Sequence, residues 1–240
     1  MRNIVFATDF TETSPYALDW ARLFARQFGA TLTLLHVYQP MVPDTTLPVL
    51  NDPGEGLTAS QDIERLSQQR LEQLAAQLTA EGLVVQTDWR AGEVKDEIMK
   101  AIADHTAHLL IISRHQADTF FDRLAGDKAT AVAHDAPCPV LLIPGDEDAV
   151  RTAPQQIRSI NYVMQQATTQ AEASRQTSDL ADAFGLAIHF VTVEQFEPKA
   201  ADLVIVTDYR PTGLFTTNPA DTVLRKAEGP VLVFHPVKES

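Results

Sequence analysis

Few side chains in this 240-residue sequence combine a reactive type with a position where ligands bind. Asp9 is the clearest of them. Ile4 to Ala7 is a short apolar segment typical of a buried strand, and Thr8 and Asp9 follow directly after its end. Open parallel sheets bind ligands beyond the carboxyl ends of their strands. Asp9 therefore marks a candidate binding site, but one acid without a basic partner does not define a reaction.

The motifs of common hydrolases, kinases and dinucleotide-binding enzymes are missing or badly placed. The sequence contains no Gly-x-Ser-x-Gly, His-Glu-x-x-His or Gly-x-x-x-x-Gly-Lys motif. Residues Gly54 to Ala59 fit a relaxed dinucleotide fingerprint, yet they follow Asn51-Asp52-Pro53 and include Glu55, whose charge opposes a pyrophosphate. We interpret them as a flexible loop that caps the next helix.

Two further polar features have ordinary structural explanations. His105 and His108 are three residues apart with Asp104 beside them, but they span the end of a predicted helix and the start of a strand, where a histidine favours the helix end. Cys138 stands between two prolines at the start of a strand, which favours a small buried side chain over a nucleophile. We therefore predict neither a metal site nor a catalytic residue.

Apolar periodicity over the first part of the chain predicts five strands that alternate with four helices. The strands are expected at Ile4 to Ala7, Thr31 to Val37, Leu83 to Trp89, Leu109 to Ile112 and Pro139 to Ile143, and the helices at Ser14 to Phe28, Ile63 to Gly82, Val94 to Ile102 and Phe120 to His134. Tyr38 to Ala59, with four prolines, is expected to be a mobile excursion. The fold class is α/β, an open parallel five-stranded sheet of Rossmann-like type with helices on both faces.

The rest of the chain repeats this pattern in a shorter form. Three segments recur in the same order: Phe28-Gly29 as Phe184-Gly185, Leu109 to Ile112 as Leu203 to Val206, and Pro139 to Leu141 as Pro230 to Leu232. The central helix, strand and helix have no counterpart, which indicates a truncated second copy. We predict a complete domain at 1–145, a linker at 146–157 and a reduced domain at 158–240.

The charge balance makes several classes of partner unfavourable. The formal net charge is −13, and this acidity disfavours binding to nucleic acid or to an anionic membrane surface. The longest apolar runs are far shorter than the ~20 residues that span a bilayer. A single cysteine and the lack of a recognisable signal segment predict a cytoplasmic protein.

The pattern resembles the universal stress protein family, well over residues 1–143 and weakly over 158–236. The residues that carry the resemblance are Asp9, Leu34-Leu35-His36-Val37, Gly92-Glu93 and Ala136 to Val140. Members that bind ATP have a signature of Gly, two residues, Gly, nine residues, Gly, then Ser or Thr, whose amide and hydroxyl donors hold the phosphates.

In this sequence the signature is degraded. The spacing fits Ser113, Gln116, Gly126 and Asp127, so one glycine remains and a carboxylate stands where phosphate needs a donor. The second copy has Thr207 and Arg210 at the first two positions and no glycine at the third. His115-Gln116 followed by Phe120-Phe121 resembles the UspA-like branch of the family, which does not bind ATP.

The resemblance therefore implies a noncatalytic stress-response protein that works through a protein partner or weak ligand sensing. Its alternative is an ATP or AMP sensor, with slow ATP hydrolysis, in which Asp9 and Val37 contact the adenosine part. The candidate nucleotide residues are Ala7, Thr8, Asp9, Val37, Ser113, Gln116, Gly126 and Asp127. No residue pattern requires a cofactor.

The resemblance also implies how the two copies meet. Single-domain relatives dimerise through the last strand, so we expect the last strands of the two copies to form a pseudo-dimer within one chain, with a homo-oligomer as a further expectation. Because the reduced copy lacks two helices, we expect its face over Ile188, Phe190 and Leu203 to be covered by the other domain or by a second molecule.

Overall fold

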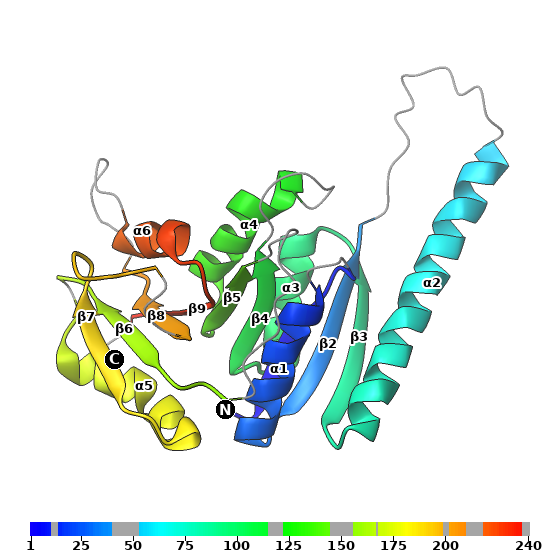
Figure 1. The fold of residues 1–240 in the computed structure, drawn as a ribbon. Helices are drawn as coiled ribbons and strands as arrows, with labels where there is room; N and C mark the ends of the chain where they lie inside the picture. The colour runs from blue at the N-terminus through cyan, green and yellow to red at the C-terminus, as the bar shows by residue number, and fades with distance from the viewer. Residues whose placement is uncertain are drawn as a thin grey trace.

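The computed structural model describes residues 1–10, 14–39, 53–114, 122–144, 156–166, 168–198, 202–209 and 218–236, with only the backbone at Ser14, 53–60, Arg114, 122–128 and Pro219. These residues form nine strands and six helices, which alternate along the chain except that β6 directly follows β5 and β8 directly follows β7 (Figure 1). The strands are β1 (Asn3–Ala7), β2 (Thr31–Tyr38), β3 (Val84–Ala91), β4 (Leu109–Arg114), β5 (Val140–Pro144), β6 (Ile160–Met164), β7 (Ile188–Thr192), β8 (Leu203–Thr207) and β9 (Val231–Phe234). The helices are α1 (Ser14–Phe28), α2 (Pro53–Ala80), α3 (Val94–Asp104), α4 (Asp122–Asp135), α5 (Gln170–Phe184) and α6 (Pro219–Lys226).

All nine strands form one sheet in the order β3-β2-β1-β4-β5-β9-β8-β6-β7. Neighbouring strands are parallel except β5 and β9, which pair antiparallel with Leu141 opposite Leu232. The strands β1 to β5 make up the predicted five-stranded parallel sheet, so the α/β fold class is confirmed. The antiparallel pair joins the first half of the chain to the second.

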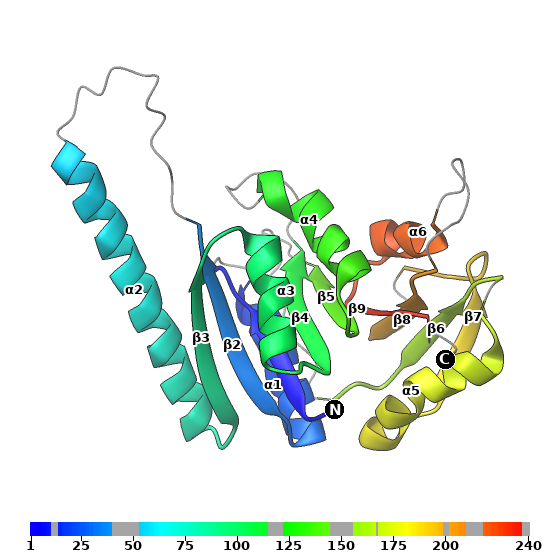
Figure 2. The ribbon, with the colours of Figure 1, turned by 180° about the vertical axis from the view of Figure 1, so that it is seen from behind.

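Helices cover both faces of the sheet (Figures 1 and 2). Side chains of α1, α2 and α5 pack with one buried cluster, whereas α3, α4 and α6 pack with the cluster on the other face. The aromatic rings of Phe24 in α1 and Phe184 in α5 lie 5.5 Å apart, edge to face. The first face is thus continuous across the junction of the two halves.

The second half contains a subset of the elements of the first. Its strand order β7-β6-β8-β9 has the same connections as β2-β1-β4-β5, with no described element in the place of α2, β3 or α3. The helices α1 and α5 both end at a glycine in the left-handed region, Gly29 with φ of 56° and Gly185 with φ of 64°. Glycine adopts this conformation without the strain that a side chain would add.

The helix α2 begins earlier than the sequence predicts. Pro53 is its first residue, so the Gly54 to Ala59 segment is helical rather than a flexible loop. Tyr38, at the other end of the predicted excursion, belongs to β2, and residues 40–52 lie outside the described part of the chain. Proline is favoured at the first helical position because its missing amide has no helical acceptor there. The amino end of α2 extends beyond the sheet (Figure 1), which leaves Ile63 53% and Leu66 52% exposed.

The apolar face of the second half is covered differently from our prediction. Leu203 is fully buried and Ile188 is partly buried in the cluster to which α5 contributes Leu180 and Phe184, so the covering helix belongs to the same half of the chain. Phe190 remains 37% exposed and lies 5.8 Å from Tyr162, ring to ring. Its exposure has a simple reason, because no described helix stands where α2 covers the equivalent strand β2.

Among the described helices, none has both the length and the apolar character needed to cross a membrane.

Candidate functional site

The carboxyl ends of β1, β2 and β4 form the candidate site. Ala7 of β1 pairs with Leu35 of β2 and with Ile112 of β4, so the three strands run side by side at this level. Because β2 and β4 lie on opposite sides of β1, the crossovers diverge here, as they do where open sheets bind ligands. The described candidate residues at this edge are Ala7, Thr8, Asp9, Val37 and Ser113.

A buried histidine fixes the segment that follows β1. The Nδ1 atom of His36 donates a hydrogen bond to the carbonyl oxygen of Thr8 over 2.8 Å, since a carbonyl can only accept. Burial lowers the pKa of His36, while the bond to Thr8 and the charge of Asp9 raise it less, so the ring is neutral near pH 7. This role of His36 is not among the predictions from the sequence, although a histidine in an apolar strand is a signal for one.

The backbone beyond Thr8 is held as well. The amide of Thr8 donates to the carbonyl oxygen of Leu35 over 2.9 Å, and the amide of Phe10 donates to Oγ1 of Thr8 over 3.2 Å. Phe10 has a φ of 60°, in the left-handed region that is uncommon for residues other than glycine, and its ring lies 4.7 Å from that of His36. Asp9 is therefore presented from a firmly positioned turn.

Two of the predicted phosphate positions lie inside a helix. Gly126 and Asp127 are the fifth and sixth residues of α4, which begins at Asp122. In an α-helix only the first four amides lack a partner within the helix, so the amides of Gly126 and Asp127 bond to the preceding turn. Of the other two positions, Ser113 lies in β4 and Gln116 lies outside the described residues.

The hydroxyl of Thr207, a predicted phosphate position in the second half of the chain, has structural partners. Thr207 is fully buried, and its Oγ1 donates to Oε1 of Gln176 over 2.8 Å and also contacts the hydroxyl of Tyr162. Burial raises the pKa of Tyr162 to about 12, so this phenol stays protonated. These contacts leave the Thr207 hydroxyl inside the protein; Arg210 lies outside the described residues.

The other polar candidates have structural partners. His105 ends α3, and its Nε2 lies 2.8 Å from a carboxylate oxygen of Asp88, while Asp104 pairs with Arg90. In the part of the chain that the structure describes, no group of three or more His, Cys, Asp or Glu side chains is arranged to hold a metal. Burial raises the pKa of Cys138 to about 12, which keeps it as an unreactive thiol at neutral pH.

A charged cluster joins the two halves of the chain. Nδ1 of His134 in α4 lies 2.7 Å from Oδ2 of Asp208, and its Nε2 lies 3.0 Å from Oδ1 of Asp221. Both contacts are hydrogen bonds only when both ring nitrogens carry a proton. The bond to Asp208 raises the pKa of His134 against the effect of partial burial, which favours this charged form.

Asp208 completes this cluster from a buried position. Its side chain is 1% exposed and also accepts a hydrogen bond from Asn218. Burial alone would raise the pKa of Asp208, but the hydrogen bonds from His134 and Asn218 outweigh it and lower the pKa. The partners of His134 are 74 and 87 residues away in sequence, so no local pattern could have revealed them.

The sheet order and the helices on both faces define an open α/β protein whose crossovers diverge at the carboxyl ends of β1, β2 and β4. The model of the universal stress protein family matches residues 1–144, and this chain belongs to that family.

Related sequences and structures agree with this membership. A universal stress protein of Thermus aquaticus is 27% identical over 146 residues, which cover 59% of this chain and 98% of the relative. One from Mycolicibacterium smegmatis is 25% identical over 150 residues, 61% of this chain, but this match spans only 49% of the relative. A solved universal stress protein of Archaeoglobus fulgidus has the same fold over 99% of this chain and 97% of its own, with a TM-score of 0.62 and 15% identity.

Proposed function

We propose that this chain is a noncatalytic universal stress protein that acts through protein contacts or weak ligand sensing and does not bind ATP tightly. The observation that supports this most is the position of Gly126 and Asp127 in the second turn of α4. Their amides are engaged within the helix, and the carboxylate of Asp127 replaces a neutral donor where a phosphate would lie.

The same edge offers little for catalysis. A reaction at Asp9 would need a second group that moves a proton or attacks a substrate. His36 is buried, and its Nδ1 proton is committed to the carbonyl oxygen of Thr8. We therefore propose no enzymatic activity for this site.

An adenine nucleotide sensor, with slow ATP hydrolysis, is the second candidate. It is favoured by the position of Asp9 and Val37 at one edge of the sheet, where ATP-binding relatives are expected to contact adenosine. AMP suits this edge better than ATP, because it presents fewer phosphates to the degraded positions. In either case the ligand would be held mainly by its adenosine part.

Calorimetric titration of the nucleotide-free chain with ATP and with AMP distinguishes the two candidates. We expect no ATP binding at millimolar concentration, in the wild type and in an Asp9→Ala variant alike. Asp62→Ala, which removes an exposed carboxylate from α2, is the matched control. Stoichiometric binding of ATP that Asp9→Ala abolishes and Asp62→Ala preserves would favour the sensor and contradict the first candidate.

We further propose that the chain is a tandem of a complete domain at 1–145 and a reduced domain at 158–240, joined by 146–157, in the cytoplasm. The antiparallel pair of β5 and β9 then takes the place of the interface between two separate chains. In this proposal the reduced domain is chiefly architectural, since its Thr207 hydroxyl is part of a buried hydrogen-bond network.

A further inference from the structure

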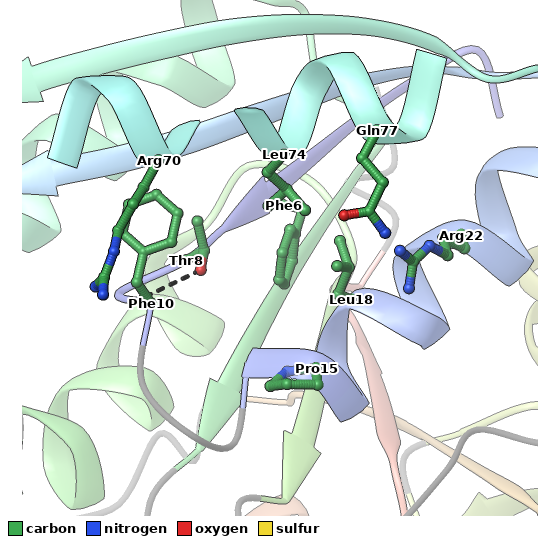
Figure 3. Close-up of a pocket in the computed structure, with 9 residues that line it drawn as sticks. All are labelled: Phe6, Thr8, Phe10, Pro15, Leu18, Arg22, Arg70, Leu74 and Gln77. Carbon is green, nitrogen blue, oxygen red and sulfur yellow. Dashed lines mark hydrogen bonds between the residues drawn. The ribbon is translucent and has the colours of Figure 1, made fainter. Parts of the chain in front are cut away.

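A cavity of about 440 Å³ lies between α1 and α2, near the end of β1 (Figure 3). Its walls include the apolar side chains Phe6, Phe10, Leu18 and Leu74. Figure 3 shows Phe6 directed between Leu74 of α2 and Leu18 of α1. The volume falls within the range of roughly 300–1,000 Å³ that small-molecule sites occupy.

This cavity shares Thr8 with the adenosine edge but lies on the other face of the sheet from Val37. Phe6 and Leu18 belong to the buried cluster on the α1 and α2 face of the sheet, whereas Val37 belongs to the cluster on the opposite face. A ligand here would therefore not occupy the position of a nucleotide that contacts Val37. Its binding does not depend on the proposed function.

Two arginines stand at opposite ends of the cavity and differ in their charge balance (Figure 3). The terminal nitrogens of Arg22 pair with Asp19 over 2.8 Å and with Glu81 over 3.1 Å, so its charge is neutralised. Arg70 has no ion pair or hydrogen-bond partner within the described ranges. A guanidinium with this freedom can bind a carboxylate or sulfonate with two parallel hydrogen bonds.

The Arg22 end offers no free donor to a ligand. Its Nε atom has no hydrogen-bond partner in the described part of the chain, but it is buried and out of reach of the cavity. The cavity thus has one charged end, apolar walls and a single neutralised polar end.

We propose that this cavity binds a small amphipathic anion, with its carboxylate at Arg70 and its apolar body between Phe6, Leu18 and Leu74. A medium-chain fatty acid is the class of ligand that fits both ends. The net charge of −13 gives no long-range attraction for an anionic ligand. The affinity must therefore come from Arg70 and the apolar walls of the cavity.

Calorimetric titration of the full chain with octanoate tests this site, with octan-1-ol as the uncharged analogue. We expect octanoate to bind one molecule per chain in the micromolar to millimolar range, and Arg70→Ala to weaken it roughly tenfold, the effect of one lost charge-assisted hydrogen bond. Arg65→Ala removes the same charge from the same helix without lining the cavity, so it should leave the affinity unchanged.

A second variant tests the apolar part of the site. Leu18→Trp should fill the cavity and abolish octanoate binding, provided that circular dichroism shows the variant to be folded. Equal affinity in the wild type and Arg70→Ala, equal binding of octan-1-ol, or no binding at millimolar octanoate would overturn the proposal. Flotation with anionic phospholipid vesicles tests whether the protein binds a membrane headgroup instead of a free fatty acid. Binding of the protein to vesicles that requires Arg70 would contradict the proposal of a free fatty acid as ligand.

Discussion

Replacing His134 with alanine should lower the free energy of unfolding by about 2 to 3 kcal/mol, because the buried carboxylate of Asp208 loses its charged partner. Asn218 still donates to Asp208, so the carboxylate is not left entirely unpaired. Chemical denaturation of the two proteins, followed by circular dichroism, measures the difference. This effect would be unusual for a side chain that is itself 22% exposed.

The partner on the other side of the ring provides the matched control. The Asp221 side chain is 44% exposed, and exposed ion pairs contribute at most about 1 kcal/mol. Asp221→Asn should therefore cost far less than His134→Ala. Equal costs for the two variants would show that burial of Asp208 is not the source of the effect.

The pH dependence of the His134 effect follows from the direction of the pKa shifts. The pKa of His134 is raised above its ordinary value of 6.5, so the stability that it contributes is full below that pH and is lost as the pH rises through the folded value. The pKa of Asp208 is lowered, so its contribution is lost only as the pH falls well below 3.8. In mildly acidic solution His134 is therefore positively charged while Asp208 is negatively charged.

The cost of His134→Ala should accordingly be larger at about pH 5.5 than at about pH 8.5. His235 is the other titratable group that acts on Asp208, so a His235→Gln variant serves to separate its contribution. A cost that is constant or that grows with pH would contradict a charged bridge at His134.

Removing residues 146–240 should convert the protein into a homodimer or an aggregate. The truncation exposes the edge of β5, whose residues Val140 to Leu142 are almost fully buried and pair with β9 in the intact chain. It also removes Phe184 from its contact with Phe24. An apolar, unpaired strand edge associates with another such edge.

Sedimentation velocity on the purified 1–145 fragment checks this prediction. Coexpression with the separate 146–240 fragment is the control, because it should restore the missing edge and yield a one-to-one complex. A 1–145 fragment that is monomeric and cooperative in unfolding would show that the β5 edge does not need a partner.

Much of the fold could be predicted from local patterns, because each element has its own apolar periodicity. The runs at Ile4 to Phe6 and Leu109 to Ile112 are buried strands, and Gly29 ends its helix with a positive φ. The start of α2 differs from the prediction because Pro53, one of four prolines in a segment that resembles a loop, is the first residue of the helix. Local pattern alone cannot decide between these two uses of proline.

The site was less predictable, because its decisive features depend on contacts between distant residues. The spacing located Gly126 and Asp127, but only the structure places their amides inside α4. The roles of His36 and His134 come from partners on other strands and on the other half of the chain. Arg70 is one of several arginines in the sequence until the fold sets it beside an apolar cavity.

The degraded phosphate positions should prevent tight binding of adenine nucleotides to this chain. To test this, the freshly purified protein is denatured and adenine nucleotides in the supernatant are measured by chromatography. We expect the supernatant to contain far less than one nucleotide per chain. One ATP or AMP per chain would contradict the claim, because it would show that a nucleotide is retained despite Gln116, Asp127 and the engaged amides of α4.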